Sequence, residues 1–351
     1  MAMQNTVEFL VKGDGIIENQ PIAEAPAHHT RKIPIHERSV RVGDVIVVNG
    51  HGVNHTLLKQ RFVEGNYHLH ETTHFLLFTR AEEPKTILVH WFTPEELHTN
   101  LSHHLAEELK PCGMITSNQV LGELMTGIVA GTRYPDDVRR AWNYFGANTL
   151  QRLLTLVSST VTSHLPDYGS LGASATLYQR VIELSVGERF LDAACNGGYF
   201  PLLLAERIPF VSEAVGVDID AEVFKGAQEL ATERHLTTVR FVQADLLAED
   251  FSAIGMFDTV TALHVLEHFT EAQMYHVMAN LLKVTAHRLI AAVPYELGEP
   301  SSAYDHKQLF TQAKLEAVGM WCIEQLQGAA RIWYEDIAPT GGLLLLERHP
   351  S

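Results

Sequence analysis

In the second half of the chain, short apolar runs alternate with stretches in which apolar residues recur every three or four positions. The apolar runs cover 190–193, 215–219, 239–244, 257–263 and 288–294. Runs of this length, rich in β-branched residues, are typical of strands, and the segments between them have the length and period of helices. Strands that alternate with helices predict an α/β fold whose parallel sheet is covered on both faces.

The first half of the chain has a different pattern. Period-two stretches at 45–48, 75–78 and 86–92 are separated by turn-like breaks, and this arrangement predicts a small antiparallel sheet. After 93–96, which looks like the capping box of a helix, the pattern becomes helical and stays so to about residue 163.

The turn after the first C-terminal strand carries the most specific chemistry. Asp192 lies at the end of that strand, small residues dominate 193–198, and Asp218 ends the next strand. Such a turn lets backbone amides approach a nucleoside cofactor, and the second acid is placed to accept hydrogen bonds from two ribose hydroxyls. The chain has no G-x-x-x-x-G-K-[ST] motif, and Asp192 would repel a pyrophosphate. We infer a cationic cofactor, S-adenosylmethionine, which carries a sulfonium and an ammonium.

From about residue 177 onward, this series of strands and turns resembles class I S-adenosylmethionine-dependent methyltransferases. The resemblance implies a Rossmann-like, mostly parallel seven-stranded sheet that ends in an antiparallel edge hairpin, here expected at 322–326 and 342–347. Before the hairpin, 305–311 is expected to open a helix that ends at Gly319, because glycine is common in the left-handed cap of a helix.

The resemblance also assigns the cofactor contacts. In the family, the acid after the third strand holds the adenine amino group, and here that acid is Asp245. The family turn usually has three glycines, and this chain departs from it at Ala194 and Asn196; alanine is still small, and asparagine tolerates positive φ. Two simpler interpretations stay open: Asp218 could cap the following helix, and Asp192 could be a strand-end acid held by backbone amides. The expected cofactor-binding residues are Asp192, Ala194, Asn196, Gly198, Asp218, Ile219, Asp245 and Leu246.

These patterns divide the chain into three expected parts. They are a β-rich N-terminal domain (1–104), a helical lid or linker (105–178) and the S-adenosylmethionine-binding domain (179–351). The lid is an analogy with small-molecule methyltransferases, in which helices before the cofactor domain commonly cover the substrate. The loop 167–172 is expected to act as its hinge.

His264 and His268 are the candidate catalytic bases. In the family, the segment after the fourth strand lies over the transferred methyl group, and imidazole titrates near neutral pH. The two histidines are four residues apart, so on a helical turn they would face the same way.

The same segment resembles a metal-binding sequence. In ubiquinone-pathway O-methyltransferases an acid-x-x-Glu-His sequence holds a divalent metal; here the first acid is His264, followed by Glu267 and His268, which argues against a magnesium-type site. The alternative is that Glu267 and His268 make structural hydrogen bonds, and we assign no metal. Tyr295, Glu296, His306 and the segment 333–336 are expected near the acceptor, without an assigned role.

Histidines are concentrated near the N-terminus, where 12 of the 20 precede residue 105. In one continuous strand His68, His70 and His74 would share a face, which suits a metal site. The simpler interpretation is a solvated strand face. The pairs His28-His29 and His103-His104 are expected at the surface.

The composition and net charge of the chain limit the classes of molecule that it is expected to bind. The net charge is −16, and residues from 179 onward contain 24 acidic against 12 basic side chains. This field repels nucleic acid. Three widely spaced cysteines, no membrane-length apolar run and no signal-like start predict a reduced, cytoplasmic protein without a membrane anchor.

We therefore expect methyl transfer to a small-molecule acceptor at O, N or C, with a homodimer as one candidate assembly. Two other functions stay open. One is a methyltransferase that acts on protein or RNA, with the N-terminal sheet as its docking surface. The other is a catalytically inactive cofactor-binding scaffold, because the turn is altered at Ala194 and Asn196. A regulatory role also stays open, in which the N-terminal domain senses a metal and controls the enzyme.

Overall fold

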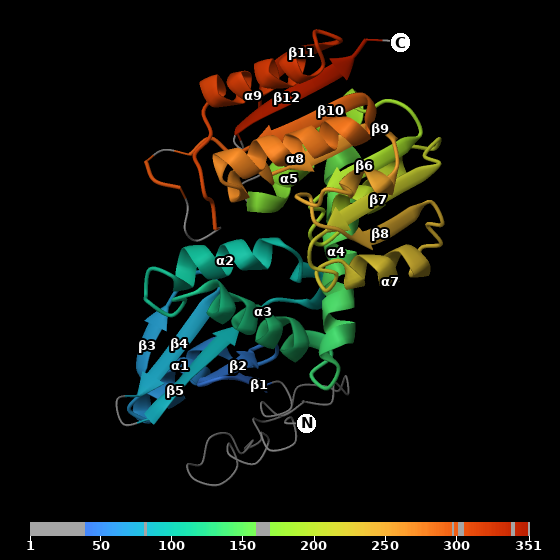
Figure 1. Cartoon of the computed structure of the whole chain (residues 1–351). Helices are drawn as coiled ribbons and strands as arrows, with labels where there is room; N and C mark the ends of the chain where they lie inside the picture. The colour runs from blue at the N-terminus through green and yellow to red at the C-terminus, as the bar shows by residue number, and fades with distance from the viewer. Residues whose placement is uncertain are drawn as a thin grey trace. The chain divides into compact units, whose positions relative to one another are not determined.

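The computed structural model of the chain describes residues 39–80, 83–158, 169–296, 298–300, 305–337 and 341–349. The chain divides into two units, Met1–Asn148 and Thr149–Ser351 (Figure 1). The pair His28-His29 and residues 167–168 of the expected hinge lie outside the described residues. None of the helices within the described ranges is long and apolar enough to cross a membrane.

The first unit contains a five-stranded sheet and the helices that pack on it. Its elements in chain order are β1 (Ser39–Val42), β2 (Val45–Asn49), α1 (His55–Glu64), β3 (His68–Glu71), β4 (Phe75–Arg80), β5 (Glu83–His90), α2 (Asn100–Leu109), α3 (Asn118–Arg133) and α4 (Val138–Ser158), whose second half belongs to the other unit. The strand order is β1-β2-β5-β4-β3. All neighbouring strands are antiparallel except β2 and β5, which are parallel.

The prediction of a purely antiparallel sheet is therefore wrong for β2 and β5. The chain leaves β2 through α1, β3 and β4 before it forms β5, and a connection of that length allows a parallel pair. Alternate residues of the strands face two cores, as period-two patterning requires. On β4, Phe75 and Leu77 pack with α2 and α3, whereas Leu76 and Phe78 pack with buried side chains of α1.

The second unit is an α/β sheet that confirms the predicted fold class. Its elements are α5 (Gly169–Leu184), β6 (Arg189–Ala193), α6 (Tyr199–Arg207), β7 (Glu213–Asp218), α7 (Lys225–Glu233), β8 (Val239–Gln243), β9 (Phe257–Leu263), α8 (Glu271–Val284), β10 (Thr285–Val293), α9 (Gln312–Gln325), β11 (Ala330–Ile337) and β12 (Gly341–Arg348). The seven strands follow the order β11-β12-β10-β9-β6-β7-β8. Five are parallel, and β12 pairs antiparallel with both β10 and β11, which makes the edge hairpin.

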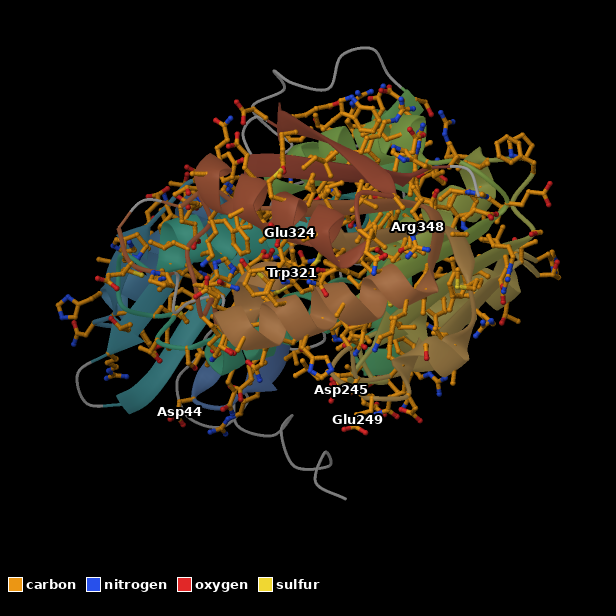
Figure 2. All side chains as sticks on the ribbon, turned by 45° about the horizontal axis from the view of Figure 1, so that its top comes forward. Asp44, Asp245, Glu249, Trp321, Glu324 and Arg348 are labelled. Carbon is orange, nitrogen blue, oxygen red and sulfur yellow. The ribbon has the colours of Figure 1, made fainter. Side chains whose placement is uncertain are left out.

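Helices cover both faces of this sheet. Leu191 and Ala193 of β6 point into one core with α8 and α9, which lie side by side in Figure 1, and Phe190 points into the other with α4, α5 and α6. Trp321 of α9, labelled in Figure 2, packs against Tyr275 of α8 with ring centroids 4.9 Å apart. The helices expected over 105–178 contribute to both units, since α2 and α3 belong to the first and α5 to the second.

The first strand of the edge hairpin lies later in the chain than predicted. Residues 322–325 form the last turn of α9, Leu326 is its C-cap, and the strand is β11, at Ala330–Ile337. The expected end of the helix at Gly319 is also wrong. Leu315, Val318 and Cys322 continue one buried face through the glycine. A Cβ at Gly319 would lie 2.2 Å from the hydroxyl oxygen of Tyr334 on β11, so this glycine permits close packing and does not cap the helix.

Replacing Gly319 by alanine is expected to lower the thermal midpoint of unfolding. The added methyl group overpacks the contact with Tyr334, whose hydroxyl donates to the carbonyl of Glu316 at 3.0 Å. Overpacking of this kind costs about 1–3 kcal/mol. Gly122 on α3 is the matched control, because a Cβ there meets nothing within 4 Å. Its alanine variant should gain up to about 1 kcal/mol; a similar change in both variants would refute the packing argument.

Candidate cofactor and acceptor site

The candidate site lies at the carboxyl edge of the second unit's parallel strands. The chain leaves β6 toward β7 and β8 on one side and continues with β9 and β10 on the other. In open α/β sheets, such a reversal of strand order opens a crevice beyond the carboxyl ends of the strands, and ligands bind there. Asp192, Asp218 and Asp245, which are the acids predicted from the sequence to contact the cofactor, lie at or next to the ends of these strands.

The turn after β6 keeps its shape without the usual glycines. Ala194, Asn196 and Gly198 all have positive φ, at 54°, 46° and 69°. For alanine this conformation is strained, and asparagine adopts it more readily. Gly198 is required for space as well, since a Cβ there would lie 2.5 Å from the Phe241 ring and 2.6 Å from the Ala227 side chain. The amide of Cys195 donates to the carbonyl of Val217 at 2.7 Å and ties the turn to β7.

Asp218 faces this turn from the end of β7. One carboxylate oxygen accepts from the Asn196 amide at 2.9 Å, and the other accepts from the Asp220 amide at 3.1 Å. Asp218 does not cap α7, which begins at Lys225. Asp220 instead holds the local turn, with its carboxylate accepting from the Glu222 amide at 2.9 Å. The next residue after Asp218, Ile219, is 65% exposed, so its apolar side chain is available to cover a planar ligand.

The loop after β8 contributes an exposed acid. Asp245 accepts from the Leu247 amide at 2.8 Å, and Figure 2 labels it together with Glu249 of the same loop. Leu246 is buried in the core, and its carbonyl accepts from the Asn280 side chain at 2.9 Å. The Asp245 carboxylate is therefore accessible, whereas the Leu246 side chain anchors the loop.

Asp192 is the buried acid of the site. Its side chain is 5% exposed, and one carboxylate oxygen accepts from the Thr261 hydroxyl at 2.7 Å. Burial raises the pKa of Asp192 to about 7; the Thr261 hydrogen bond opposes this shift, and the Asp218 charge adds to it. The interpretation of Asp192 as a strand-end acid held by backbone amides does not describe this geometry, because its partner is a side-chain hydroxyl.

Beyond β9 the chain brings together four titratable side chains. His264 has a positive φ of 56°, and its Nδ1 lies 3.6 Å from Oε1 of Glu267. Glu267 is 2% exposed, and its Oε2 has no hydrogen-bond partner. The rings of His268 and His306 lie edge to face with centroids 5.0 Å apart. The left-handed His264 precedes a short 3-10 turn, Leu266–His268, so the expectation that His264 and His268 share a helical turn is wrong.

The ligand atoms of Glu267, His268 and His306 lie within 4.8 Å of one another. Two imidazoles and a carboxylate suit zinc, iron or manganese better than magnesium, so these residues fit a divalent transition metal. In this group the third possible ligand is His306, whereas the resemblance to the acid-x-x-Glu-His sequence would assign that position to His264. The spacing of residues in the sequence does not predict that His306 joins the group, because His306 lies in the segment after β10. Its Nδ1 lies 2.9 Å from Oε2 of Glu296.

The remaining acceptor candidates separate in the structure. Tyr295 forms a parallel bridge with Phe310 next to the strand ends, and burial raises the pKa of its hydroxyl. The segment 333–336 belongs to β11. There Glu335 forms a bidentate ion pair with Arg180, at 2.6 and 2.7 Å, and Trp333 is 40% exposed.

The histidines of the first unit do not form the expected triad. His68 and His70 lie on β3 with exposed side chains, but that strand ends at Glu71. His74 follows in the turn before β4, where both its amide and its ring contact Glu108 of α2. The prediction that His68, His70 and His74 share a strand face is therefore wrong.

Known proteins are similar to the part of the chain that forms these strands. Residues 190–288 match the family model described as a methyltransferase domain. Among curated proteins, the chain is 28% identical over 130 residues to a ubiquinone biosynthesis O-methyltransferase of Psychrobacter arcticus, covering 36% of this chain and 48% of the relative. It is 30% identical over 109 residues to the protein of that name from Pectobacterium atrosepticum, covering 30% and 43%. The chain thus spans less than half the length of these relatives.

Among solved structures, the chain is similar to magnesium protoporphyrin IX methyltransferase from Synechocystis PCC 6803 with bound S-adenosylmethionine. The sequence identity is 18%, the TM-score is 0.41, and the match covers 60% of this chain and 95% of that one.

The family match runs from Phe190 in β6 to Arg288 in β10 and includes the turn after β6, Asp218 and Asp245. The strand order of the sheet and the acids at its carboxyl edge lead to the same assignment. Residues 190–288 are thus similar to the methyltransferase domain family, and the seven-stranded sheet around them has the architecture that the resemblance to class I S-adenosylmethionine-dependent methyltransferases implies.

Proposed function

We propose that the chain transfers the methyl group of S-adenosylmethionine to an oxygen atom of a small-molecule acceptor. The observation that carries this proposal is the meeting, at one sheet edge, of the acids Asp192 and Asp218 with His264 at the end of the neighbouring β9. Oxygen is proposed because the curated relatives are named O-methyltransferases. A small acceptor is supported by the excess of acidic residues, which disfavours a polyanion.

The cofactor is held by complementary charge. We assign the ribose hydroxyls to Asp218, the adenine amino group to Asp245 and the methionine ammonium to Asp192, with the turn amides and Ile219 completing the contact. Asp192 is the acid suited to an ammonium ion, because a buried carboxylate gains most from a paired cation. Binding of this cation favours the ionised form and lowers the pKa that burial has raised.

His264 is the proposed general base. Methyl transfer is an in-line displacement: the acceptor oxygen forms a bond to the methyl carbon while the carbon–sulfur bond breaks, and S-adenosylhomocysteine leaves. The hydroxyl proton passes to the imidazole, and Glu267, 3.6 Å away, stabilises the imidazolium that forms. A metal held by Glu267, His268 and His306 would polarise the acceptor hydroxyl.

Turnover with a panel of hydroxylated small molecules tests the proposal. Full-length protein and S-adenosylmethionine are incubated with each acceptor, and S-adenosylhomocysteine is quantified, with Asp218→Ala as the inactive control. Formation of S-adenosylhomocysteine that depends on an acceptor supports the proposal. Tight cofactor binding without turnover on any acceptor would favour the scaffold function, and a salt-dependent shift of RNA in a gel would favour an RNA substrate.

Replacing His264 by glutamine is expected to lower kcat by about 10²- to 10⁴-fold, the usual contribution of a general base. The KM for S-adenosylmethionine should stay within a factor of about two, since the imidazole is not assigned to the cofactor. His276→Gln is the matched control, because this exposed histidine of α8 has no assigned role, and it should leave kcat unchanged. Equal losses of kcat in both variants would contradict the assignment of His264 as the base.

A further inference from the structure

A second group of metal-ligating side chains lies in the first unit and shares no residue with the site described above. Within the described part of the chain, the ligand atoms of His74, His104 and Glu108 lie within 4.8 Å of one another. His104 and Glu108 are four residues apart on α2 and therefore project from the same face of the helix. His74 reaches them from the turn that connects β3 to β4.

The contacts of His74 hold it against the helix. Its backbone amide donates to Oε2 of Glu108 at 2.9 Å, and its Nδ1 contacts Oε1 of the same carboxylate. Thr72 also forms a hydrogen bond with Glu108, and the hydrogen bonds from Thr72 and His74 outweigh burial, so the pKa of Glu108 is lowered.

Aromatic packing fixes the two imidazole rings. Their centroids lie 4.2 Å apart, and both rings stack on Phe92, whose centroid is 5.5 Å from that of His74 and 5.9 Å from that of His104. Metal sites use such surrounding contacts to orient their ligands. The side chains of His74 and Glu108 are 35% and 15% exposed, so the group is half-buried yet open to an ion from solvent.

We propose that His74, His104 and Glu108 form a binding site for a divalent transition metal of the zinc type. Two imidazoles and one carboxylate are borderline ligands that suit zinc, cobalt or iron, whereas calcium and magnesium require oxygen ligands. Three protein ligands leave a fourth position for water or an exogenous ligand, which distinguishes the site from a closed structural zinc site. The ion takes over the carboxylate that the His74 ring otherwise contacts.

Cobalt(II), a spectroscopic substitute for zinc, provides the test. Metal-stripped full-length protein is titrated with cobalt in the His268→Ala background, which removes a ligand from the group at the methyltransferase site. We expect one equivalent to produce the intense visible absorption of a four-coordinate site, and zinc to displace it. If no such absorption develops in the folded protein, the contact between His74 and Glu108 is a structural ion pair and the proposal is wrong.

Matched variants locate the ion. His104→Ala and Glu108→Gln should weaken cobalt binding by more than about 100-fold, because losing even a group that only orients a ligand costs 10- to 100-fold. His103→Ala, on the exposed side of α2, and His70→Ala, on β3, should bind as the parent does. Circular dichroism establishes that each variant is folded, and Glu108→Gln retains an oxygen for the His74 amide. Unchanged binding in folded His104→Ala and Glu108→Gln would overturn the proposal.

Discussion

Replacing Asp218 by alanine is expected to abolish measurable binding of S-adenosylmethionine. Each hydrogen bond between a hydroxyl and a charged carboxylate contributes about 1.5–3 kcal/mol, so losing two of them weakens affinity by roughly 10²- to 10⁴-fold. The loss has a second source within the protein. The Asp218 carboxylate accepts from the amides of Asn196 and Asp220, and its removal releases the turn whose strained residues it helps to hold.

Calorimetric titration of the cofactor into full-length protein, dialysed against chelator, measures this effect. Asp220→Ala is the matched control, two residues away. Asp220 accepts from the Glu222 amide and has no assigned cofactor contact, so its removal should cost about 1 kcal/mol of stability and little affinity. Equal losses of affinity in the two variants would show that the loop, and not the Asp218 carboxylate, determines binding. Absence of binding by the unaltered protein would refute the cofactor site itself.

Replacing Asp192 by asparagine is expected to stabilise the cofactor-free protein and to weaken cofactor binding. The pKa of Asp192 is about 7 in the folded state, against 3.8 for an aspartate that is fully exposed to water. A carboxyl whose folded pKa is raised binds more protons folded than unfolded between these values, so the free energy of unfolding falls as pH rises from about 4 to 7. Since one pKa unit corresponds to about 1.4 kcal/mol, the penalty at neutral pH is on the order of a few kcal/mol.

The variant should therefore gain little stability at pH 4 and most above pH 7. Urea unfolding of the full-length variant and parent between pH 4 and pH 8 measures the difference in their free energies of unfolding. The transition to follow is that of the unit Thr149–Ser351. Thr261→Val provides a test of sign, because it removes the hydrogen bond that lowers the pKa of Asp192. In that variant the pH-dependent loss should extend to higher pH. A stability difference between Asp192→Asn and the parent that does not change with pH would contradict a raised pKa.

Cofactor binding should respond in the opposite direction. The ammonium pairs with the ionised carboxylate, so the affinity of the parent is expected to rise from pH 6 to pH 8. The Asp192→Asn variant should be weaker at pH 8 and nearly independent of pH over this range. A substitution that stabilises the protein but lowers its affinity for the cofactor indicates that the acid is present in the core for binding and not for stability.

The local features of the methyltransferase unit could be predicted from the sequence. The strand at 257–263 was predicted at the bounds that β9 has, and the acids Asp192, Asp218 and Asp245 do lie at or next to strand ends. The bounds of the strand and the positions of these acids depend on short contiguous segments of the sequence. Apolar runs form the strands, and small or acidic residues end them. The mostly parallel seven-stranded sheet with its antiparallel edge hairpin also followed, through the family resemblance, and the carboxyl edge follows from parallel strands.

Contacts between distant segments depend on the tertiary structure. Gly319 has the appearance of a helix cap in the sequence, and only the Tyr334 hydroxyl on a later strand shows that it serves close packing. His306, from the segment after β10, lies near Glu267 and His268. In the first unit, His104 and Glu108 of α2 lie near His74, which precedes β4. Hydrophobic periodicity reports which face of an element is buried, but not which side chains it meets there. The sequence by itself thus determined the fold class and the acids at the carboxyl edge of the sheet, whereas both candidate metal groups were decided by packing between segments far apart in the chain.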